Sequence, residues 1–493
     1  MKRIVTGRRM KEMDQTTIRE MGIPSCVLME RAALAVAEEV KKTHPIKVLV
    51  LCGNGNNGGD GVAVARILHL WGIPSEFCMV KNPGNYTEET KRQIEIARNY
   101  QVRQVNNPRL DEYTTIVDAV FGIGLSRPVE GIYKEVIRKV NETKACKIAV
   151  DIPSGICADT GAILGIAVKA DVTVTFGCMK RGHCFYPGAS YAGKILVKDI
   201  GIYPGKEDRT DVWMLEEKDK NWLPPRKEDG NKGTFGKVLV VAGSKNMAGA
   251  AYLSARACLY AGCGMVKILT EEENRIILQG LLPEAMLAAG EEEQSWQEAL
   301  DWCDAVVIGP GLGKSIKSRQ KTQWFLKNCR KPMVADADAL NLLSENREWE
   351  KWLSPRCILT PHMGEMERLC KKSVREIKKD RIGEACRLAE KLGIVCVLKD
   401  ARTVIADERG NCWLNGNGNA GMATAGSGDV LSGIIGALLG NGMEQMKAAV
   451  LGNYLHGRSG DLARGQKGER SMTAQDLIEF LPETFAEMEK NLC

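Results

Sequence analysis

Residues 47–71 read KVLVLCGNGNNGGDGVAVARILHLW, and this stretch decides the fold of the first half of the chain. It starts with a run of apolar and β-branched residues, passes through a loop of glycine and asparagine, and ends in an apolar pattern of helical length. A buried strand, a glycine-rich turn and a covering helix in this order form the basic unit of a parallel sheet. The stretch therefore predicts an α/β fold.

The same alternation of strands and helices extends outward from this unit in both directions. Two amphipathic helices are expected before it, at residues 10–20 and 26–41. The strands expected after it are residues 75–80, 114–120, 147–152, 171–176 and 194–198, and the helices are residues 87–100 and 131–141. Strands that alternate with helices indicate crossover connections, which place helices on both faces of a parallel sheet. We therefore expect a Rossmann-like three-layer domain in the N-terminal part of the chain.

A second α/β unit follows a break in this periodicity. Between Ile202 and Gly236 the chain is rich in charged residues and prolines, a composition typical of a domain boundary. We expect the first domain at residues 1–215, a linker at 216–230 and the second domain at 231–493. The strands expected in the second domain are residues 237–241, 265–269, 305–308, 332–335, 357–360, 394–399 and 403–406, and its last helices are residues 429–439, 443–463 and 473–489. The halves share no repeat, so two different domains are expected.

The composition excludes several classes of protein. Hydrophobic residues make up 44% of the 493 residues and charged residues 26%, which rules out a disordered or fibrous chain. Lysine and arginine exceed aspartate and glutamate by only 6, and aromatic residues are 5%, so no nucleic-acid partner is expected. The 17 cysteines form no C-x-x-C pair, and no apolar run is long enough to span a membrane. A cytoplasmic protein with small-molecule substrates and no membrane partner is therefore expected.

Three loops of the first domain carry polar side chains directly after expected strands. The loop Gly53–Gly58 matches G-x-G-x-x-G, which indicates a dinucleotide site, and Glu76 near the end of the next strand would then bind a ribose. The continuation to Gly61 adds oxygens and amides, which suit polar recognition or a cation better than a bare pyrophosphate cradle. Asp118 and Asp151 follow two further strands. Because the carboxyl ends of parallel strands share one edge, a site is favoured over isolated helix caps.

Four segments of the first domain occur in a fixed order, namely MDQTTIREMGIPSCVLMERAA, CGNGNNGGDG, DAVFGIGLSRPV and DIPSGICADTG. They resemble the NAD(P)H-hydrate epimerase domain (YjeF N-terminal domain) over nearly all of residues 1–200. The resemblance implies that the hydrated nicotinamide nucleotide contacts Asn56, Asn57, Gly58, Gly59, Asp60, Gly122, Ile123, Gly124, Leu125, Ser126, Arg127, Pro128, Tyr133 and Asp151. It also implies that Asn57, Asp118 and Ser154 surround a potassium ion, and that Asp151 is the acid or base.

The second domain carries its strongest signal in residues 425–433, AGSGDVLSG, directly before an apolar helix. Glycines let the backbone approach a phosphate, the helix N-terminus offers aligned N–H groups, and Asp429 places one carboxylate there. An aspartate in a first turn can simply stabilise the helix dipole, but the many small residues before it favour an anion hole with a base. Other polar or glycine-rich loops follow expected strands at residues 247–250, 309–313, 360–365 and 399–403.

The segments KGTFGKVLVVAGS, GPGLG, DADALN, TPHMGEM and GSGDVLSG occur in this order from about Lys232 onward. They resemble the ribokinase-like fold and, more narrowly, the ADP-dependent NAD(P)H-hydrate dehydratase domain (YjeF C-terminal domain). The resemblance implies nucleotide contacts from Lys399, Asp400, Ala401, Arg402, Thr403 and Gly428, and substrate contacts from Ala250, Gly311 or Gly313, His362 and Asp429. Asp429 would be the base. Mg²⁺ would accompany the nucleotide, with Glu365 as the candidate for a water-mediated contact. The residues that depart from the family's frequent ones are Ser427, Met363 and Asp400.

Together the two resemblances imply a bifunctional enzyme that repairs hydrated NADH and NADPH. One domain would interconvert the R and S hydrates, and the other would dehydrate the S form with ADP or ATP by phosphorylation of the ring hydroxyl and elimination. One alternative is a small-molecule kinase of the ribokinase superfamily fused to a non-catalytic Rossmann-like binding domain. Another is a binding scaffold, which the complete motifs around Asp118, Asp151 and Ser154 make the weakest option. A homo-oligomer is expected because such assemblies are common.

Overall fold

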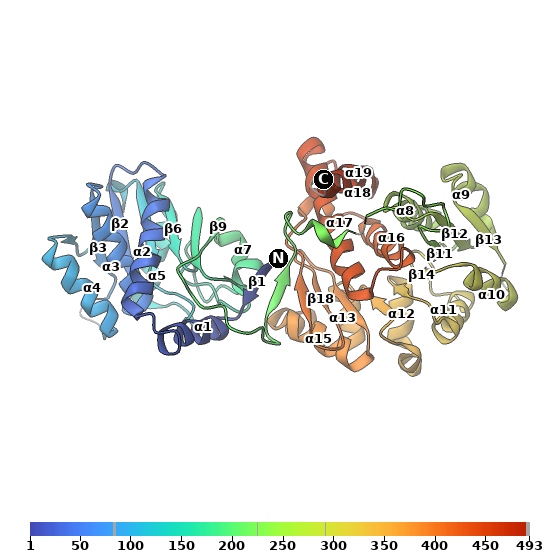
Figure 1. Ribbon diagram of the computed structural model, residues 1–493, viewed down its shortest axis with the longest axis horizontal. Helices are drawn as coiled ribbons and strands as arrows, with labels where there is room; N and C mark the ends of the chain where they lie inside the picture. Colours follow the sequence, from blue (N-terminus) through green and yellow to red (C-terminus); the bar gives the residue numbers. More distant parts are fainter. Residues whose placement is uncertain (82–84, 224, 291, 490–493) are drawn as a thin grey trace. The chain divides into compact units, whose positions relative to one another are not determined.

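The computed structural model describes residues 1–81, 85–223, 225–290 and 292–489 (Figure 1). The chain divides into two compact units, Lys2–Asp211 and Val212–Cys493. Each unit alternates strands with helices along the chain and buries its own clusters of apolar side chains. The expected α/β class is therefore confirmed.

The sheet of the first unit is parallel throughout. Its strands are β2 (Val48–Cys52), β3 (Ser75–Met79), β4 (Arg103–Gln104), β5 (Thr115–Ala119), β6 (Cys146–Val150), β7 (Val172–Phe176) and β9 (Lys194–Lys198), in the order β4-β3-β2-β5-β6-β7-β9. The chain winds outward from β2 in one direction and from β5 in the other. In such a sheet the ligand crevice lies at this switch point, outside the carboxyl ends of the two strands.

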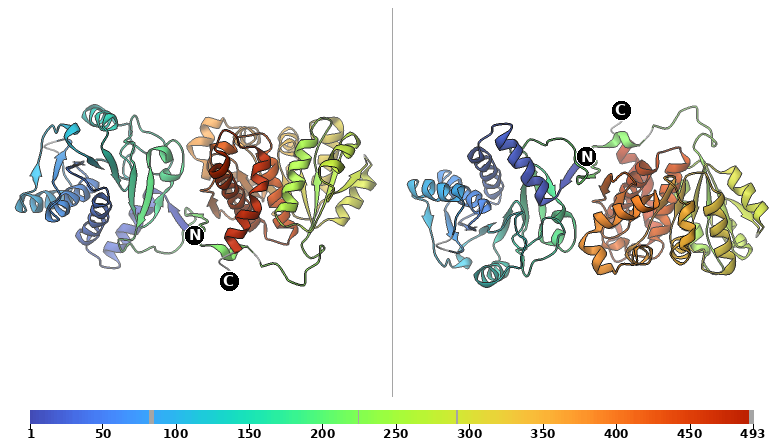
Figure 2. Two further views of the ribbon diagram at one scale, coloured as in Figure 1. Left: turned by 90° about the horizontal axis from the view of Figure 1, so that it is seen from above. Right: turned by 90° about the horizontal axis from the view of Figure 1, so that it is seen from below.

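Helices cover both faces of this sheet. They are α1 (Gly7–Arg19), α2 (Ser25–Lys41), α3 (Asn56–Leu70), α4 (Glu88–Asn99), α5 (Gly131–Glu142), α6 (Arg181–Cys184) and α7 (Gly188–Tyr191), and the short strands β1 (Lys2–Val5) and β8 (Met179–Lys180) pair in parallel beside them. Val48 and Val50 of β2 pack in the core under α2 and α3, whereas Leu49 and Leu51 pack in the core under α5. In Figure 2 the blue helices and the teal helix accordingly lie on opposite sides of these strands. Three layers result.

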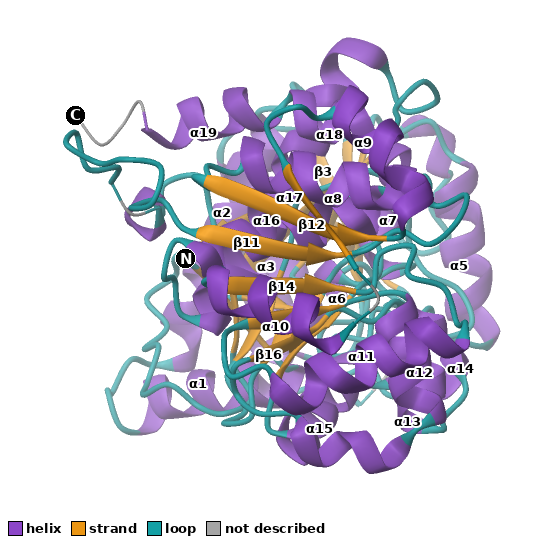
Figure 3. Ribbon diagram, turned by 90° about the vertical axis from the view of Figure 1, so that its right-hand side faces the viewer, coloured by secondary structure: helices purple, strands orange, loops and turns teal. Residues whose placement is uncertain are grey.

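The second unit has one sheet that contains both parallel and antiparallel strands, and several of these strands lie side by side in Figure 3. The strands are β10 (Val212–Met214), β11 (Lys237–Val241), β12 (Met265–Thr270), β13 (Met286–Ala289), β14 (Ala305–Ile308), β15 (Met333–Ala335), β16 (Cys357–Leu359), β17 (Val395–Leu398), β18 (Val404–Ala406) and β19 (Cys412–Leu414). Their order is β13-β12-β11-β14-β15-β16-β17-β18-β19-β10. The sheet is parallel from β13 to β17, and β18 pairs antiparallel with both its neighbours.

Helices follow most strands of the second sheet. They are α8 (Ala248–Tyr260), α9 (Arg275–Leu281), α10 (Glu293–Trp302), α11 (Ile316–Asn328), α12 (Asp338–Glu345), α13 (Met363–Cys370), α14 (Val374–Lys379), α15 (Arg381–Leu392), α16 (Ser427–Gly440), α17 (Gln445–Lys467), α18 (Ala474–Glu479) and α19 (Leu481–Glu489). The apolar sides of α8, α16 and α17 share one buried cluster with Val238, Val240 and Val307 of the strands. This cluster fixes where α16 begins, at the carboxyl edge of the sheet.

The second unit starts before the linker expected at residues 216–230. Val212–Met214 forms β10, which pairs in parallel with β19, and Leu215 and Leu223 lie in the core of this unit. The ring of Trp222 packs against that of Trp413, with 4.8 Å between their centres. Apolar residues spaced among many charges thus attach much of this segment to the second sheet.

Several expectations drawn from composition can be compared with the structure. The described cysteines form no disulfide, and most of them are buried, as expected for small core residues. Within the residues that the structure describes, there is no helix of the length and apolarity that a membrane span requires.

The glycines of α16 allow this helix to pack directly on α8. A β carbon added to Gly433 would lie 2.2 Å from the carbonyl oxygen of Ser254, far inside van der Waals contact. We expect Gly433→Ala to lower the free energy of unfolding by about 1–3 kcal/mol or more, because the two backbones must separate. Chemical denaturation of the purified protein measures this change.

Gly465→Ala is the matched control for Gly433→Ala. Gly465 lies on α17, is exposed, and has no atom within 4 Å of an added β carbon. Alanine there should raise stability by about 0.5–1 kcal/mol, because glycine in a helix loses more conformational freedom on folding. Equal effects of both substitutions would contradict the packing argument.

Candidate active sites

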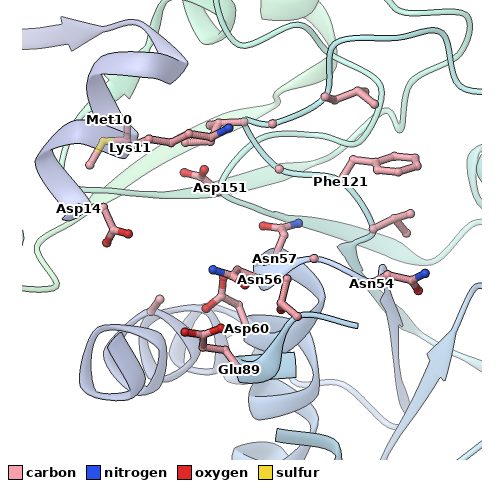
Figure 4. Close-up of a pocket in the computed structure, with 18 of the residues that line it drawn as sticks. Met10, Lys11, Asp14, Asn54, Asn56, Asn57, Asp60, Glu89, Phe121 and Asp151 are labelled. Carbon is pink, nitrogen blue, oxygen red and sulfur yellow. The ribbon is translucent and has the colours of Figure 1, made fainter. Parts of the chain in front are cut away.

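A cavity of about 1310 Å³ lies at the switch point of the first sheet, between the loops that follow β2 and β5. It extends to side chains of α1 and α2 and to Asp151, directly after β6. Figure 4 shows Asp14, Asp60 and Asp151 around this cavity, carried by α1, α3 and the loop after β6. The three loops that were expected to line one crevice therefore do so.

Most of the residues expected to bind substrate in the first unit line this cavity. They are Asn56, Asn57, Asp60, Gly122, Ile123, Gly124, Leu125, Ser126, Arg127, Pro128, Tyr133 and Asp151. Gly58 and Gly59 are buried behind the loop instead. A β carbon on Gly58 would lie 1.8 Å from the carbonyl oxygen of Gly53, and one on Gly59 would lie 3.0 Å from the side chains of Met29 and Thr90. These two glycines let the loop fold tightly against the protein.

Asp118 is a buried carboxylate held by the loop that follows β6. Its Oδ1 accepts a hydrogen bond of 2.6 Å from the Ser154 hydroxyl, and its Oδ2 accepts one of 2.8 Å from the Ser154 amide. Burial raises the pKa of Asp118 to about 6, since no lysine or arginine in the described part of the chain pairs with it. The Asn57 amide lies against Gly122 nearby, and its Nδ2 is buried without a hydrogen-bond partner. The three residues expected around a cation are therefore close to the same pair of loops.

Asp151 sits in a left-handed backbone conformation, with φ of 66°, at the inner end of the cavity. Its Oδ1 accepts hydrogen bonds of 2.5 Å from Lys180 Nζ and 2.9 Å from the Thr175 hydroxyl. Burial raises the pKa of Asp151, but the ammonium of Lys180 outweighs burial and holds this pKa below its usual value. Asp151 is therefore a carboxylate at neutral pH and suits the role of a base.

Two further carboxyl groups of this cavity titrate in the opposite direction. Burial, and then the charge of Asp151, raise the pKa of Asp14, and the same two causes raise that of Asp60 well above its usual value. Neighbouring carboxyl groups with separated pKa values are typical of acid and base pairs in active sites. Sequence reasoning did not single out Asp14 or Lys180. The position of Lys180, shortly after the strand β7, is the signal that could have indicated it.

The expectation that Glu76 binds a ribose is wrong. Glu76 is the second residue of β3, so it lies near the amino end of its strand, at the edge away from the cavity. Its carboxylate accepts hydrogen bonds from Arg103, at 2.9 Å, and from the Tyr113 hydroxyl, and Lys47 Nζ lies 3.4 Å away. Glu76 is thus engaged in a structural ion-pair cluster.

In the second unit, a buried ion pair joins three post-strand elements. Lys399 Nζ, after β17, donates a hydrogen bond of 2.7 Å to Oδ1 of Asp336, after β15. The Ser432 hydroxyl of α16 donates one of 2.5 Å to the other oxygen, Oδ2. Asp336 is 1% exposed, and the charge of Lys399 outweighs burial and keeps its pKa low. Asp336 is the first aspartate of the DADALN segment, and the sequence alone gives no sign of its pairing with Lys399.

Asp429 lies in the first turn of α16, next to this ion pair. Burial, followed by the charge of Asp336, raises the pKa of Asp429 to about 7, although Lys399 opposes this. A β carbon added to Gly428 would lie 3.3 Å from Lys399 Nζ, so the glycine-rich loop before α16 lies close to this lysine. A carboxyl group that titrates near neutrality beside an ammonium and a helix N-terminus can act as a base toward a hydroxyl group that receives a phosphoryl group.

His362 and Glu365 lie beside Lys399, because His362 forms a parallel bridge with Lys399 at the sheet edge. His362 Nδ1 accepts the amide of Gly364 at 3.0 Å, and Glu365 Oε2 accepts the amide of His362 at 2.8 Å. Burial raises the pKa of Glu365 to about 7. Both side chains therefore cap α13 and are held at the same edge as Asp429.

The remaining expected residues of the second site occupy neighbouring loops. Gly311 approaches Ala250 at the start of α8, with 2.7 Å between their β-carbon positions. The Gly313 amide donates a hydrogen bond of 2.8 Å to Asp338. Asp400, Ala401, Arg402 and Thr403 form the turn between β17 and β18. Asp400, one of the departures from the family pattern, pairs with Arg381 at 3.2 Å, so its charge is compensated.

Both units of the chain are similar to known proteins. The family model described as NAD(P)H-hydrate dehydratase matches residues 238–483, and the model described as YjeF-related protein N-terminus matches residues 25–182. The second unit is similar to the crystal structure of a ribokinase-like superfamily protein from Enterococcus faecalis, with a TM-score of 0.52 and 28% identity. That likeness covers 57% of this chain and 96% of the other.

Some known proteins are similar in sequence to this chain over nearly its full length. The bifunctional NAD(P)H-hydrate repair enzyme Nnr of Thermofilum pendens is 37% identical, over 96% of this chain and 94% of that protein. The enzyme of the same name from Escherichia coli is also 37% identical, over 94% of this chain and 90% of that protein. This chain therefore belongs to the family of bifunctional NAD(P)H-hydrate repair enzymes.

Proposed function

We propose that this chain repairs hydrated NADH and NADPH in two reactions, one in each unit. The first unit epimerises the R and S hydrates, and the second dehydrates the S hydrate at the expense of ADP or ATP. The observation that carries the proposal is the placement of one carboxylate at the carboxyl edge of each sheet, Asp151 in the first and Asp429 in the second. The relatives that match almost the whole chain are named as NAD(P)H-hydrate repair enzymes, which favours this function over that of a small-molecule kinase.

The chemistry of the hydrate explains the role of Asp151. Hydration of an enamine leaves the hydroxyl on the carbon next to the ring nitrogen, and the two epimers differ at this carbon. When a base takes the hydroxyl proton, the C–O bond becomes a carbonyl and the C–N bond breaks, with its electron pair going to nitrogen, which is protonated. Reclosure on the other face gives the other epimer. We assign the removal of this proton to Asp151, whose pKa is held low, and the donation of a proton to Asp60, whose pKa burial and the charge of Asp151 raise well above its usual value.

The residues near Asp118 fit a potassium ion. The Asp118 carboxylate is buried and has no lysine or arginine partner among the described residues, and the Asn57 side-chain carbonyl and the Ser154 hydroxyl lie at the same loops. These are oxygen atoms of the kind that such an ion binds. We propose Asn57, Asp118 and Ser154 as its ligands. The ion would supply a fixed positive charge beside the two loops that line the cavity.

Removal of potassium should therefore lower epimerisation selectively. When potassium is replaced by tetramethylammonium, the conversion of R to S hydrate is expected to fall, because Asp118 remains uncompensated and the loops lose a common ligand. Dehydration of pure S hydrate in the same buffers is the internal control. Epimerisation that is equally fast in both buffers would contradict the assignment, and Asp118→Asn should remove the response to potassium.

In the second unit we propose that Asp429 takes the proton of the ring hydroxyl while the terminal phosphoryl group of the nucleotide moves to the hydroxyl oxygen. Phosphate then leaves with the C–O bonding pair, and loss of a proton from the neighbouring carbon restores the double bond. The loop 425–428 would bind the transferred phosphate, and Lys399 to Thr403 would contact the nucleotide. The buried Glu365 carboxylate fits a water-mediated contact to Mg²⁺, which would neutralise the nucleotide phosphates when bound.

One assay tests both reactions. A mixture of R and S hydrates is incubated with the protein, Mg²⁺ and either ADP or ATP, and the return of the dihydronicotinamide absorbance is followed. Full conversion is expected. Conversion of the S form alone would remove the epimerase assignment, and no conversion with either nucleotide would remove the dehydratase assignment. Many of the described cysteines are buried among apolar residues, as is common in reducing compartments, and homo-oligomers are frequent, so we also propose a cytoplasmic homo-oligomer.

A further inference from the structure

A single four-residue segment of the first unit holds Asp151 from two sides. Lys180, which ends β8, and His183 of α6 both reach this residue, and both side chains are buried, at 1% and 2% exposure. Lys180 contacts the carboxylate, whereas His183 contacts the backbone carbonyl of the same aspartate. Neither residue belongs to the set that the family resemblance assigns to this site.

The ammonium of Lys180 is fully occupied by protein groups. Its Nζ donates to Asp151 Oδ1 at 2.5 Å, to the Thr175 hydroxyl at 2.8 Å and to the carbonyl of Phe176 at 3.2 Å. An ammonium has three protons, so none is left for a substrate. Lys180 therefore acts through Asp151 and not directly on the reacting atoms.

His183 fixes the backbone at the same point. Its Nδ1 accepts the amide proton of Lys180 at 3.1 Å, so the ring proton is on Nε2, which donates to the carbonyl of Asp151 at 2.9 Å. Burial, followed by the charge of Lys180, lowers the pKa of His183 to about 4, so the ring stays neutral and keeps this arrangement above that pH. The left-handed conformation of Asp151 is thereby held from outside its own loop.

The two contacts leave one carboxylate oxygen open. Oδ1 of Asp151 accepts two hydrogen bonds, whereas Oδ2 accepts none from the residues that the structure describes, and Asp151 lines the cavity. The charged side chains that line this cavity from the other elements are those of Lys11, Asp14, Asp60, Lys81, Glu89, Arg127 and Glu130. The pKa values of Asp14 and Asp60 are raised by the charge of Asp151, so these two carboxyl groups disfavour a further negative charge nearby.

We propose that Lys180 and His183 are positioning residues for epimerisation, which hold Asp151 as an ionised base with Oδ2 turned to the substrate. This inference rests on the proposed epimerase function. Lys180 offsets both the burial of Asp151 and the neighbouring carboxyl groups, and His183 fixes the direction in which the carboxylate points. The base consequently stays active at pH values at which an unpaired buried aspartate would be protonated.

The test is the pH profile of kcat/KM for R-to-S conversion, measured by chromatographic separation of the epimers. In Lys180→Met, the pKa of Asp151 should rise, because burial is no longer offset. Since the base must be ionised, activity is lost as pH falls through this higher pKa. We expect the acid limb to move up by at least about one pH unit. At pH values on this limb, activity relative to that at pH 9 should therefore be at least about tenfold lower than in the wild-type protein. Lys180→Arg, which keeps the charge, should return the limb toward the wild-type position.

Two milder variants keep the test decisive if Lys180→Met folds poorly. Thr175→Val removes one hydrogen bond to Oδ1 and should move the acid limb in the same direction by less. His183→Gln should lower activity at all pH values and move the limb less than Lys180→Met does, because its contact is to the carbonyl and its charge has a smaller effect on the pKa of Asp151 than that of Lys180. Dehydration of S hydrate by the second unit of the same molecules is the internal reference for the amount of protein in each assay.

The outcomes separate the inference from the function on which it rests. If the wild-type protein does not interconvert R and S hydrates, the proposed epimerase function fails. The second case is a wild-type protein that interconverts the hydrates. If Lys180→Met and Thr175→Val then lose activity equally at every pH, or keep the wild-type pH profile, the positioning role is wrong, and Lys180 and His183 are structural.

Discussion

Replacement of Asp429 by asparagine should lower kcat for dehydration of the S hydrate by about 10²–10⁴-fold. The substitution keeps the size of the side chain but removes the only group in the first turn of α16 that can take the hydroxyl proton. Epimerisation in the first unit should continue at the wild-type rate. Stopped assays that quantify R hydrate, S hydrate and the reduced nucleotide separately measure both activities in one sample.

The pH dependence of the wild-type protein is part of this expectation. Because the pKa of Asp429 is about 7, kcat/KM for dehydration should fall about tenfold per pH unit below that value, where the base is protonated. Asp301→Asn, at an exposed position on α10, is the matched control and should change neither activity. Loss of both activities in Asp429→Asn would contradict two independent sites.

Asp151→Asn is expected to stop epimerisation and to spare dehydration. The amide cannot accept the hydroxyl proton, and the Lys180 ammonium then faces a neutral group in a buried position. We expect a loss of about 10²–10⁴-fold in R-to-S conversion. With a mixture of epimers, the absorbance should rise only until the S form is consumed, and the R form should remain.

Asp111→Asn provides the control for this substitution, since Asp111 is exposed and lies outside the cavity of the first unit. It should convert the complete mixture. Continued conversion of the R form by Asp151→Asn, beyond its slow spontaneous change without protein, would show that another group is the base. Loss of dehydration in this variant would instead indicate damage that reaches the second unit.

The alternation of strands and helices was sufficient to predict two parallel α/β units and the edge at which polar residues gather. This prediction is possible because the carboxyl ends of parallel strands lie at one edge of the sheet. A loop that follows a strand in the sequence is therefore expected at that edge in space. Asp118 and Asp151 were accessible by this argument. The Glu76 error has the same origin, because the assignment depended on which end of a five-residue strand the glutamate occupies.

Buried ion pairs had no local signal. Lys180 contacts Asp151 from 29 positions away, and Lys399 contacts Asp336 from 63 positions away. Such pairs form only when distant strands meet, and neither a lysine nor an aspartate in isolation indicates a partner. The glycine-rich loops were similarly ambiguous, because Gly58 and Gly433 serve contacts within the protein.

The Lys399–Asp336 pair has a consequence for how this enzyme can change over generations. Loss of Lys399 alone would leave the buried Asp336 carboxylate without its cationic partner, and loss of Asp336 alone would leave the partly buried Lys399 ammonium without its anionic partner. A change at one position is therefore costly to the fold unless the other position changes with it. A lineage that loses this pair must pass through a less stable protein that carries only one of the two residues. No single substitution removes the pair without this loss of stability.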